Sequence, residues 1–600
     1  VHEQNEKYLN DLKYKFDKIE ITSMWSNHLK PNQSHPPHTH SNNLLSGVFY
    51  LHSEFPASPI QFLWFSSIVC PALDIFFQHG YNIGFLQLPW IELAYLGILL
   101  LEVNTEKLEL SKMLISKKNE VYLKLTDVEP SVSAELNDFF TFEVPGFKYI
   151  PAYRNKMWDG KIRLYNIVTG EIYVGLLPYI EEYLKNNGET YELETGVRSE
   201  RTVAGSVVQG FVRGLRPTLN GQRIEVRDYQ IDAIAHAIAT NRSLLISPTA
   251  SGKSLIIYCL VRYYQMMELK TLILVPTTSL VEQMYKDFDD YGWSSETYCQ
   301  KIYQGYDKKA TKDVVISTWQ SIHRMPRQYF RQFGAVFGDE AHLFKAKSLT
   351  GILTKLDTCK YRFGLTGTLD GTQTHRLVLE GLFGKAKYVI TTKELIDNKT
   401  LADLEIKCIV LKYPDEDRQI VKDFEYAAEL EYIVTKAERN TFLCNLVGYC
   451  NGNTLCLFQF VEKHGKVLYD IINDKYKDRK VFFVYGGVNT DTREEIREIV
   501  ENEKDAIIVA SYGTFSTGIN IRNIHNIVFA SPSKSKIRVL QSLGRGLRQS
   551  GGGKILRLYD ISDDLSLDSK INFTLRHFKE RINIYQEQNF DYKIDRIKLK

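Results

Sequence analysis

The sequence predicts an α/β protein whose core consists of two open parallel sheets. Short apolar runs repeatedly end in glycine or small polar residues, and a stretch long enough for a helix follows each, which is typical of buried parallel strands. This pattern occurs twice, first from about residue 220 and again from about residue 400. A chain of 600 residues also exceeds what one core supports, so we expect several domains.

Composition narrows the classes of function. Apolar residues make up 44% of the chain and charged residues 24%, which is typical of a soluble globular protein. The formal net charge of +3 does not by itself indicate nucleic-acid binding, so a basic binding face must be found locally. None of the eight cysteines forms a CxxC pair, and we expect reduced, mostly buried thiols rather than a zinc site or disulfides.

Residues 1–112 form an atypical upstream segment. No Lys or Arg occurs between Lys30 and Lys107, although these two types supply 75 of the 600 residues. The apolar stretch 81–101 approaches the length of a membrane span, but a proline and a glutamate interrupt it and no basic residue flanks it closely. We therefore expect no membrane span.

A histidine pair stands out in the upstream segment. His38 and His40 alternate onto one face of an extended stretch, as metal-binding histidines do on strands. The stretch 35–51 resembles the metal-binding segment of 2-oxoglutarate/iron(II) oxygenases. That resemblance implies a later histidine ligand and a later arginine that binds the 2-oxoglutarate carboxylate.

Neither the later histidine ligand nor the later arginine is convincingly present in this chain. His52 and His79 stand in no clear ligand context, and no arginine precedes Arg154. We therefore expect residues 1–112 to be a remnant of a truncated neighbouring domain, fused ahead of a chain that could start at Met113. An active oxygenase and a small partner-binding domain are the alternatives.

Residues 113–205 are predicted to form a small α+β nucleic-acid-binding domain. Alternation over 121–125 predicts a strand, 129–142 reads as a helix, and Asp159-Gly160 is typical of a hairpin turn. Basic groups contact phosphates and aromatic rings stack on bases, so the basic and aromatic residues around this turn suit nucleic acid. The predicted contacts are Lys148, Arg154, Lys156, Trp158, Lys161 and Arg163. The alternative is a sheet with an aromatic core and a solvated basic face.

Residues 247–254 read as a tight loop between a strand and a helix. Backbone N–H groups of such a loop, together with the helix N-terminus, face an anionic phosphate. Lys253 would reach the β- and γ-phosphates, and the Ser254 hydroxyl would bind Mg²⁺. Ser247 stands where this pattern usually has its first glycine, and an ordinary strand-to-helix turn is the alternative.

Two further groups suit nucleotide hydrolysis. Asp339 and Glu340 follow an apolar run, where the aspartate can hold Mg²⁺ through water and the glutamate can orient the attacking water. Helix capping is the alternative for this pair. Arg545 and Arg548 are spaced to lie on one helix face, and they could stabilise phosphate charge across a cleft as arginine fingers. A solvated surface is the alternative for them.

In order and spacing, these segments resemble the motifs of superfamily 2 helicases across residues 220–560. The matching segments are Gln230, Pro248–Ser254, Pro276–Thr278, Ser317–Gln320, Asp339–His342, Thr366–Thr368, Ser516–Gly518 and Gln541–Arg548. The family's DEAH box is matched residue for residue by Asp339–His342. Thr366-Gly-Thr368, a candidate coupler between the lobes, departs from the common Ser-Ala-Thr form, which leaves open how tightly hydrolysis is coupled to unwinding.

The resemblance implies two RecA-like lobes, at 206–395 and 396–565, with ATP and Mg²⁺ between them and a basic helical tail at 566–600. The implied catalytic residues are Lys253, Asp339, Glu340, Arg545 and Arg548, with Ser254 and Asp339 on Mg²⁺. The implied nucleotide contacts are Gln230, Thr249, Ser251, Gly252, Lys253, Ser254 and Gly518. The implied nucleic-acid contacts on the lobes are Thr277, Trp319, Gln320 and Thr514.

From about residue 113 onward, the chain resembles phage helicases that remodel branched DNA. This implies ATP-driven junction migration, fork regression and unwinding of RNA–DNA loops in phage replication, recombination and repair, in the host cytoplasm. The implied partners are branched or forked DNA and RNA–DNA hybrids, with phage recombination or single-strand-binding proteins as candidates and no membrane. The alternative is a translocating ATPase subunit of a restriction or nuclease complex, which would need a nuclease carboxylate cluster that we do not find.

Overall fold

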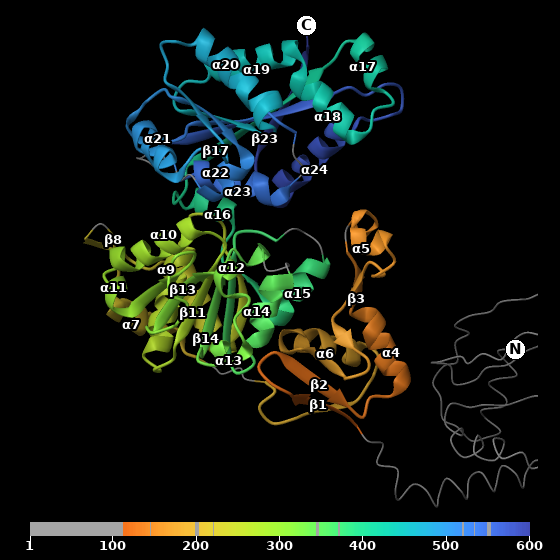
Figure 1. Cartoon of the computed structure of the whole chain (residues 1–600), viewed down its shortest axis with the longest axis vertical. Coiled ribbons are helices and arrows are strands. Elements are labelled where there is room, and N and C mark those ends of the chain that lie inside the picture. Colours follow the sequence, from red (N-terminus) through yellow and green to blue (C-terminus); the bar gives the residue numbers. More distant parts are fainter. Residues whose placement is uncertain are drawn as a thin grey trace, which may run out of the picture. The chain divides into compact units, whose positions relative to one another are not determined.

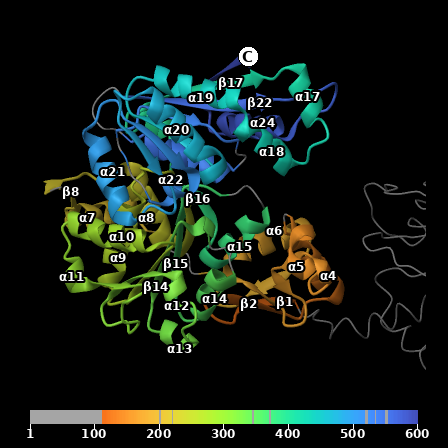
Figure 2. The same ribbon diagram turned by 45° about the horizontal axis from the view of Figure 1, so that its top comes forward.

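The computed structural model describes residues 112–599 except for 145, 199–202, 220, 344–346, 370–372, 519–520, 522, 533–534 and 549–553. The described residues belong to one compact unit with one five-stranded and two seven-stranded sheets (Figures 1 and 2). The histidine pair and the apolar stretch predicted upstream lie outside the described residues. Within the described part, no helix is long and apolar enough to cross a membrane.

The small α+β domain contains the five-stranded sheet, in the order β5-β6-β2-β1-β7. Its elements are β1 (Met113–Lys117), β2 (Tyr122–Thr126), α4 (Pro130–Phe139), β5 (Tyr165–Asn166), β6 (Glu171–Tyr173), η2 (Val174–Leu176), α6 (Leu177–Asn186) and β7 (Tyr191–Leu193). Leu123 and Leu125 alternate into the core, where Leu136 of α4 and Ile180 of α6 join them. The strand and the helix predicted here are confirmed, although the helix ends at Phe139.

A separate projection, which we call the arm, spans residues 141–163. It contains β3 (Thr141–Glu143), η1 (Phe147–Tyr149), α5 (Pro151–Arg154) and β4 (Lys161–Arg163). Strand β3 pairs antiparallel with β4, and in Figure 1 α5 stands away from the five-stranded sheet. The hairpin turn predicted at Asp159-Gly160 is wrong, because no strand precedes it directly. Gly160 is instead required by packing, since a Cβ there would lie 2.4 Å from the Phe147 ring.

The second sheet and its helices form lobe 1, with strand order β12-β13-β11-β14-β15-β10-β16 and only parallel pairs. Its elements are α7 (Gly205–Leu215), β8 (Thr218–Leu219), β9 (Gln222–Arg223), α8 (Asp228–Thr240), β10 (Arg242–Ile246), α9 (Lys253–Gln265), β11 (Thr271–Val275), α10 (Thr278–Asp290), α11 (Ser295–Tyr298), β12 (Cys299–Ile302), β13 (Val314–Thr318), α12 (Trp319–Ile322), α13 (Arg327–Phe330), β14 (Ala335–Asp339), η3 (Ala341–Leu343), α14 (Lys347–Lys355), β15 (Tyr361–Thr366), α15 (Gln373–Phe383) and β16 (Ala386–Tyr388). Strands β11, β13, β14 and β15 are buried along their whole length, which explains their continuous apolar runs.

The third sheet and its helices form lobe 2, with strand order β19-β20-β18-β21-β22-β17-β23, again entirely parallel. Its elements are α16 (Thr392–Asp397), β17 (Asp403–Lys412), α17 (Asp415–Val421), α18 (Tyr426–Thr435), α19 (Ala437–Tyr449), β18 (Thr454–Phe458), η4 (Val461–Lys466), α20 (Val467–Lys475), β19 (Val481–Val484), α21 (Thr490–Asn502), β20 (Ile507–Ser511), α22 (Tyr512–Gly518), β21 (Asn526–Phe529), α23 (Lys536–Gly546), β22 (Ile555–Asp564), α24 (Phe573–Glu587) and β23 (Tyr592–Lys598). The two parallel sheets confirm the predicted fold class.

The C-terminal segment differs from the predicted helical tail. Residues 566–600 contribute α24 and then β23, which pairs with β17 as an edge strand of lobe 2. An edge strand tolerates charged residues on its open side, so its sequence carries little apolar signal. The buried ion pair between Arg581 and Asp560, at 2.8 Å, joins α24 to β22.

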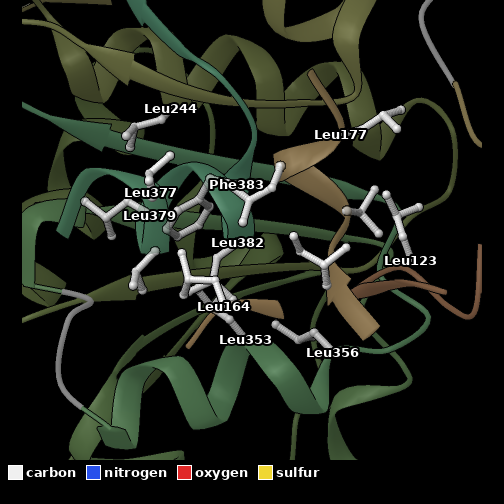
Figure 3. Packing of buried hydrophobic residues seen from close by; sticks show 14 of the residues in the cluster. Leu123, Leu164, Leu177, Leu244, Leu353, Leu356, Leu377, Leu379, Leu382 and Phe383 are labelled. Carbon is white, nitrogen blue, oxygen red and sulfur yellow. The ribbon is translucent and has the colours of Figure 1, made fainter. Parts of the chain in front are cut away.

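The small domain shares a core with lobe 1. Figure 3 shows Leu123, Leu164 and Leu177 of the domain near Leu353, Leu382 and Phe383 of lobe 1, all in one buried cluster. The fully buried Glu380 accepts hydrogen bonds from Tyr179 Oη, from Arg376 Nε at 3.1 Å and from the Ala386 N–H at 2.9 Å. The domain is therefore a fixed extension of lobe 1.

Replacing Gly175 tests this docking. A Cβ at residue 175 would lie 1.9 Å from the Glu380 carbonyl oxygen, which belongs to the backbone and cannot rotate away. We expect Gly175→Ala to lower the free energy of unfolding by about 1–3 kcal/mol, measured by urea denaturation. Gly210→Ala is the matched control, because nothing lies within 4 Å of its added Cβ. Equal midpoints for Gly175→Ala and the native chain would contradict the tight docking.

Candidate functional site

The phosphate loop joins β10 to α9, as the sequence predicts. Ala250 and Gly252 adopt positive φ angles of 67° and 84°, which give the loop its tight curvature. Lys253 Nζ lies 3.2 Å from the Ser247 carbonyl oxygen and 3.4 Å from that of Pro248, so the lysine side chain folds over the loop. A lysine placed this way can meet a phosphate held by the loop.

Ser247, which replaces the usual first glycine, closes the loop. It is fully buried, and its Oγ lies 2.6 Å from Ser251 Oγ. Ser251 Oγ also donates to the Pro248 carbonyl at 2.6 Å, while the Ser247 N–H donates to the Thr366 carbonyl at 2.8 Å. Ser247 thus joins the two ends of the loop through Ser251 and joins the loop to β15 through Thr366.

Gln230, at the start of α8, braces the same loop. Its Nε2 donates to the Ser251 carbonyl at 2.8 Å, and its Oε1 accepts from the Arg227 N–H at 2.9 Å. A Cβ on residue 252 would lie 2.3 Å from Gln230 Nε2, so this approach requires Gly252. The contact of Gln230 with the nucleotide stays a prediction.

The carboxylate pair lies at the end of β14, close to Lys253. Burial and the neighbouring Glu340 raise the pKa of Asp339, while Lys253 lowers it. Burial also acts to raise the pKa of Glu340, but the nearby His342 and the charges of Lys253 and Arg545 lower it below its usual value. Glu340 is therefore held as the anion, the form that can orient water or accept its proton.

His342 links this pair to the predicted coupler Thr366-Gly-Thr368. His342 Nδ1 lies 3.4 Å from Glu340 Oε2 and 3.0 Å from Thr366 Oγ1. Thr366 Oγ1 in turn donates to the Thr368 carbonyl at 2.9 Å. A shift of the Glu340 side chain would therefore alter the position of Thr368. The change would pass from Glu340 to His342, from His342 to Thr366 and from Thr366 to Thr368.

Two residues that the sequence analysis missed engage Ser254. Ser254 Oγ lies 2.8 Å from Tyr291 Oη and also hydrogen-bonds Asp287. Burial raises the pKa of Asp287 to about 6, although the Ser254 hydrogen bond opposes this shift. No local pattern marks either residue, because both reach Ser254 only through the packing of α10 on α9.

The two predicted arginine fingers come from lobe 2 and act on carboxylates of lobe 1. Burial and Arg548 lower the pKa of Arg545 to about 10, whereas Glu340 raises it. Arg548 in turn lowers the pKa of Asp287. Helix α23 ends at Gly546, so Arg548 lies beyond the helix and not on its face as predicted.

The lobes also meet at Thr249, where a Cβ on Gly544 would lie 2.6 Å from the threonine Cβ. A cavity of ≈ 610 Å³ lies beside this contact. It reaches the loop at Pro248 and Thr249, and its wall includes Thr368 of lobe 1 and Gln541 of lobe 2. Both lobes therefore bound the space next to the phosphate loop.

Comparison with known proteins decides the family. The "ATP-dependent DNA helicase uvsW" of Enterobacteria phage T4 is 35% identical over 493 residues, which cover 79% of this chain and 97% of that protein. The chain belongs to the UvsW family of ATP-dependent DNA helicases. Residues 115–194 match "DNA helicase UvsW, N-terminal", residues 223–371 match "Type III restriction enzyme, res subunit", and residues 438–550 match "Helicase conserved C-terminal domain".

Other similarities span less of the chain or are weaker. The "DNA 3'-5' translocase XPB2" of Sulfurisphaera tokodaii is 24% identical over 397 residues, covering 60% of this chain and 85% of that protein. The crystal structure of T4 UvsW is 33% identical, covers 82% of this chain and 100% of that one, and superposes with a TM-score of 0.45.

UvsW-family helicases use ATP, usually with Mg²⁺. The residues of this site suit that metal, since the Ser254 hydroxyl and the Asp339 carboxylate are the hard oxygen ligands that Mg²⁺ prefers. When bound, Mg²⁺ would neutralise phosphate charge.

Gly518, which was predicted to contact the nucleotide, is the last residue of α22.

The nucleic-acid contacts predicted on lobe 1 lie at neighbouring strand ends. Thr277 Oγ1 caps α10 by accepting from the Leu280 N–H at 3.3 Å. Gln320 Nε2 donates to the Pro276 carbonyl at 3.3 Å, which joins the start of α12, where Trp319 lies, to the end of β11.

Thr514 of lobe 2 differs from these residues. It is buried, and its Oγ1 lies 2.8 Å from Ser511 Oγ. Its contact with nucleic acid stays a prediction.

The predicted contacts on the arm are mostly exposed. Lys148, Arg154, Lys156 and Lys161 are exposed, whereas Trp158 is half-buried and donates from Nε1 to the Lys161 carbonyl at 2.8 Å. Arg163 instead forms a 2.5 Å ion pair with Asp159. Arg163 is exposed as well, so the arm presents five cations to solvent over a short distance in the sequence, one of them paired with Asp159.

Lys554 is a further residue that the sequence analysis missed. It is buried, and its Nζ donates to the carbonyl oxygens of Gly546, at 2.9 Å, and Arg548, at 3.0 Å. The Ala402 N–H also donates to the Leu547 carbonyl at 2.8 Å. A cation on the last carbonyls of a helix stabilises its end, so Lys554 fixes the segment that carries Arg545 and Arg548, the two predicted arginine fingers.

Lys554 variants test this positioning. We expect Lys554→Met to lower kcat for ATP hydrolysis about 10–100-fold with little change in KM, because the finger shifts while the loop stays intact. Lys554→Arg should restore most of the rate.

The pH profile gives a second readout. Burial lowers the pKa of Lys554 to about 8, so its ammonium and its charge-assisted hydrogen bonds are present below pH 8 and lost above it. The rate should therefore fall above pH 8 in the native chain but not in Lys554→Arg. Native kcat in Lys554→Met would contradict this role.

Proposed function

We propose that this helicase remodels branched or forked DNA by junction migration, fork regression and unwinding of RNA–DNA loops. It would act in phage replication, recombination and repair in the host cytoplasm, beside recombination or single-strand-binding proteins. The observation that carries this proposal is the cationic arm on a domain fixed to lobe 1, within residues that match the UvsW N-terminal family. Such a domain can hold one duplex arm of a junction while the lobes move another strand.

In the proposed cycle, ATP binds between the lobes. Lys253 would hold the β- and γ-phosphates, and Ser254 and Asp339 would hold Mg²⁺ when it is bound. Glu340 orients the attacking water and accepts its proton, since the surrounding charges keep it anionic. Arg545 stabilises the charge that develops on the γ-phosphoryl group as the bond to the leaving oxygen breaks.

Hydrolysis would be transmitted to DNA through the contacts of the carboxylate pair. Release of the γ-phosphate removes the group that Glu340 and Arg545 share, so the lobes separate. The His342–Thr366 hydrogen bond passes the same change to the coupler. The strand ends with Thr277 and Gln320 then move relative to lobe 2, which shifts the bound strand.

The competing function is a translocating subunit of a restriction or nuclease complex. The match of residues 223–371 to a restriction-enzyme family concerns the motor lobe alone. Among the residues that the structure describes, no group of three or more His, Cys, Asp or Glu side chains is placed to hold a metal ion. No observation favours this function over the first.

A substrate panel tests the proposal. We expect ATP-dependent unwinding of four-way junctions and forks to exceed that of linear duplex, with Lys253→Ala inactive on all three. Arg154→Ala/Lys156→Ala should weaken junction binding and reduce the slope of log K against log salt by about 2, since two phosphate contacts are lost.

The matched control is Lys463→Ala/Lys477→Ala, which removes two exposed charges from lobe 2. This control should leave the salt slope unchanged. Equal unwinding of linear and branched substrates, or an unchanged slope in the arm variant, would count against the proposal.

A further inference from the structure

The tip of the arm exposes two large apolar side chains. Tyr149 and Met157 each have a relative exposure of 78%, among the highest of the large apolar residues in the described chain. Tyr149 is one of the aromatic residues around Asp159-Gly160 that suit nucleic acid by sequence, whereas Met157 was not predicted to contact it. Single exposed apolar side chains are common on protein surfaces, whereas apolar groups gathered in one place and rimmed by polar residues mark a binding site.

The tip is built to hold these side chains in place. Phe147 packs edge-on against Tyr153 with ring centroids 4.6 Å apart, and Gly160 lies close under the Phe147 ring. Arg154 Nε donates to the Lys148 carbonyl at 3.4 Å, which joins α5 to η1. Tyr149 and Met157 therefore stand on a small packed unit and not on a bare loop.

The charged residues between 144 and 158 are all positive. Lys148 and Lys156 directly precede Tyr149 and Met157 in the sequence, and both are exposed, as is Arg154. The acidic residues of the arm, Glu143 and Asp159, flank this stretch, and Asp159 is paired with Arg163. A cationic rim around an apolar centre complements a polyanion whose interior is apolar. Duplex DNA has this character where a base pair is left unstacked, because phosphates flank the bare face of the bases.

We propose that Tyr149 and Met157 form a wedge that enters the duplex at a branch point and covers the unstacked base pair there. The rim lysines and arginine would hold the flanking phosphates, while the ring and the thioether replace the lost base stacking. A continuous linear duplex offers no such open base face within its length. This inference rests on the proposed action on branched DNA and assigns the residues that recognise the branch.

The docking of the small domain gives the wedge a fixed base. Glu380 binds Tyr179 of the domain, and Arg242 Nη2 of lobe 1 lies 3.2 Å from Glu120 Oε2 of the domain. The wedge is thus carried by lobe 1, which also carries the phosphate loop. Movement of a strand by lobe 2 would then draw the duplex onto a stationary wedge.

The test compares the full chain with a Tyr149→Ser/Met157→Ser variant. The matched control is Val168→Ser, which removes an apolar side chain with 90% exposure from the β5–β6 turn of the same domain. The probe is a four-way junction with 2-aminopurine at the branch-point base pair. Binding is measured with a non-hydrolysable ATP analogue, followed by unwinding with ATP.

The native chain and Val168→Ser should change the 2-aminopurine fluorescence on binding, whereas the double variant should not. Junction unwinding should fall about tenfold or more in the double variant, as expected when base stacking on a side chain is lost. ATP hydrolysis stimulated by single-stranded DNA should remain native, because the motor is untouched. Tyr149→Phe/Met157→Leu should restore the unwinding.

Other results separate the two proposals. Native fluorescence change and native junction unwinding in the double variant would overturn the wedge while leaving the action on branched DNA intact. Failure of the native chain to favour branched over linear DNA would instead overturn the proposed function. If the double variant alone changes from a dimer to a monomer in light scattering, the tip binds a second copy of this chain and the wedge is overturned.

Discussion

The structure depends on the balance of charge around Asp339 and Glu340. Two adjacent carboxylates repel each other, and burial strengthens that repulsion because less water remains to screen it. Lys253 offsets it from the phosphate loop, and Arg545 offsets it from lobe 2. Lobe 2 therefore completes the electrostatics of a site whose loop and carboxylates belong to lobe 1. This supports the proposal that nucleotide hydrolysis is coupled to the approach of the two lobes.

The remaining architecture keeps each side of this cleft rigid. On one side, the buried Glu380 side chain is paired with Arg376, accepts from the Ala386 N–H of lobe 1, and accepts from Tyr179 of the small domain. Removing one partner of such a group is costly, so the domain stays with lobe 1. On the other side, the Arg581–Asp560 pair holds α24 within lobe 2, and Lys554 fixes the end of α23. The arm and the phosphate loop therefore both belong to lobe 1 and its attached domain, while the predicted arginine fingers belong to lobe 2.

Much of this could be predicted from the sequence, because the decisive signals are local. Strands such as β11 and β14 are buried throughout and read as continuous apolar runs, and the loop from Ser247 onward has fixed spacing. Features that depend on tertiary packing were predicted wrongly. Gly160 serves the Phe147 ring and not a two-residue turn, and β23 is a charged edge strand. Tyr291, Asp287 and Lys554 reach the site only through long-range packing, so no local pattern could have found them.

Single-turnover ATP hydrolysis by Arg545→Ala in the presence of DNA tests the central claim most directly. The rate should fall about 10³-fold or more if the arginine of lobe 2 stabilises the transition state formed in lobe 1. The Kd for ATP, measured in parallel, should change far less, because the loop and Lys253 remain. Arg331→Ala, which removes a half-exposed arginine of lobe 1 that pairs with Asp357, should hydrolyse ATP at the native rate. A native hydrolysis rate in Arg545→Ala would contradict the claim that both lobes build the active site.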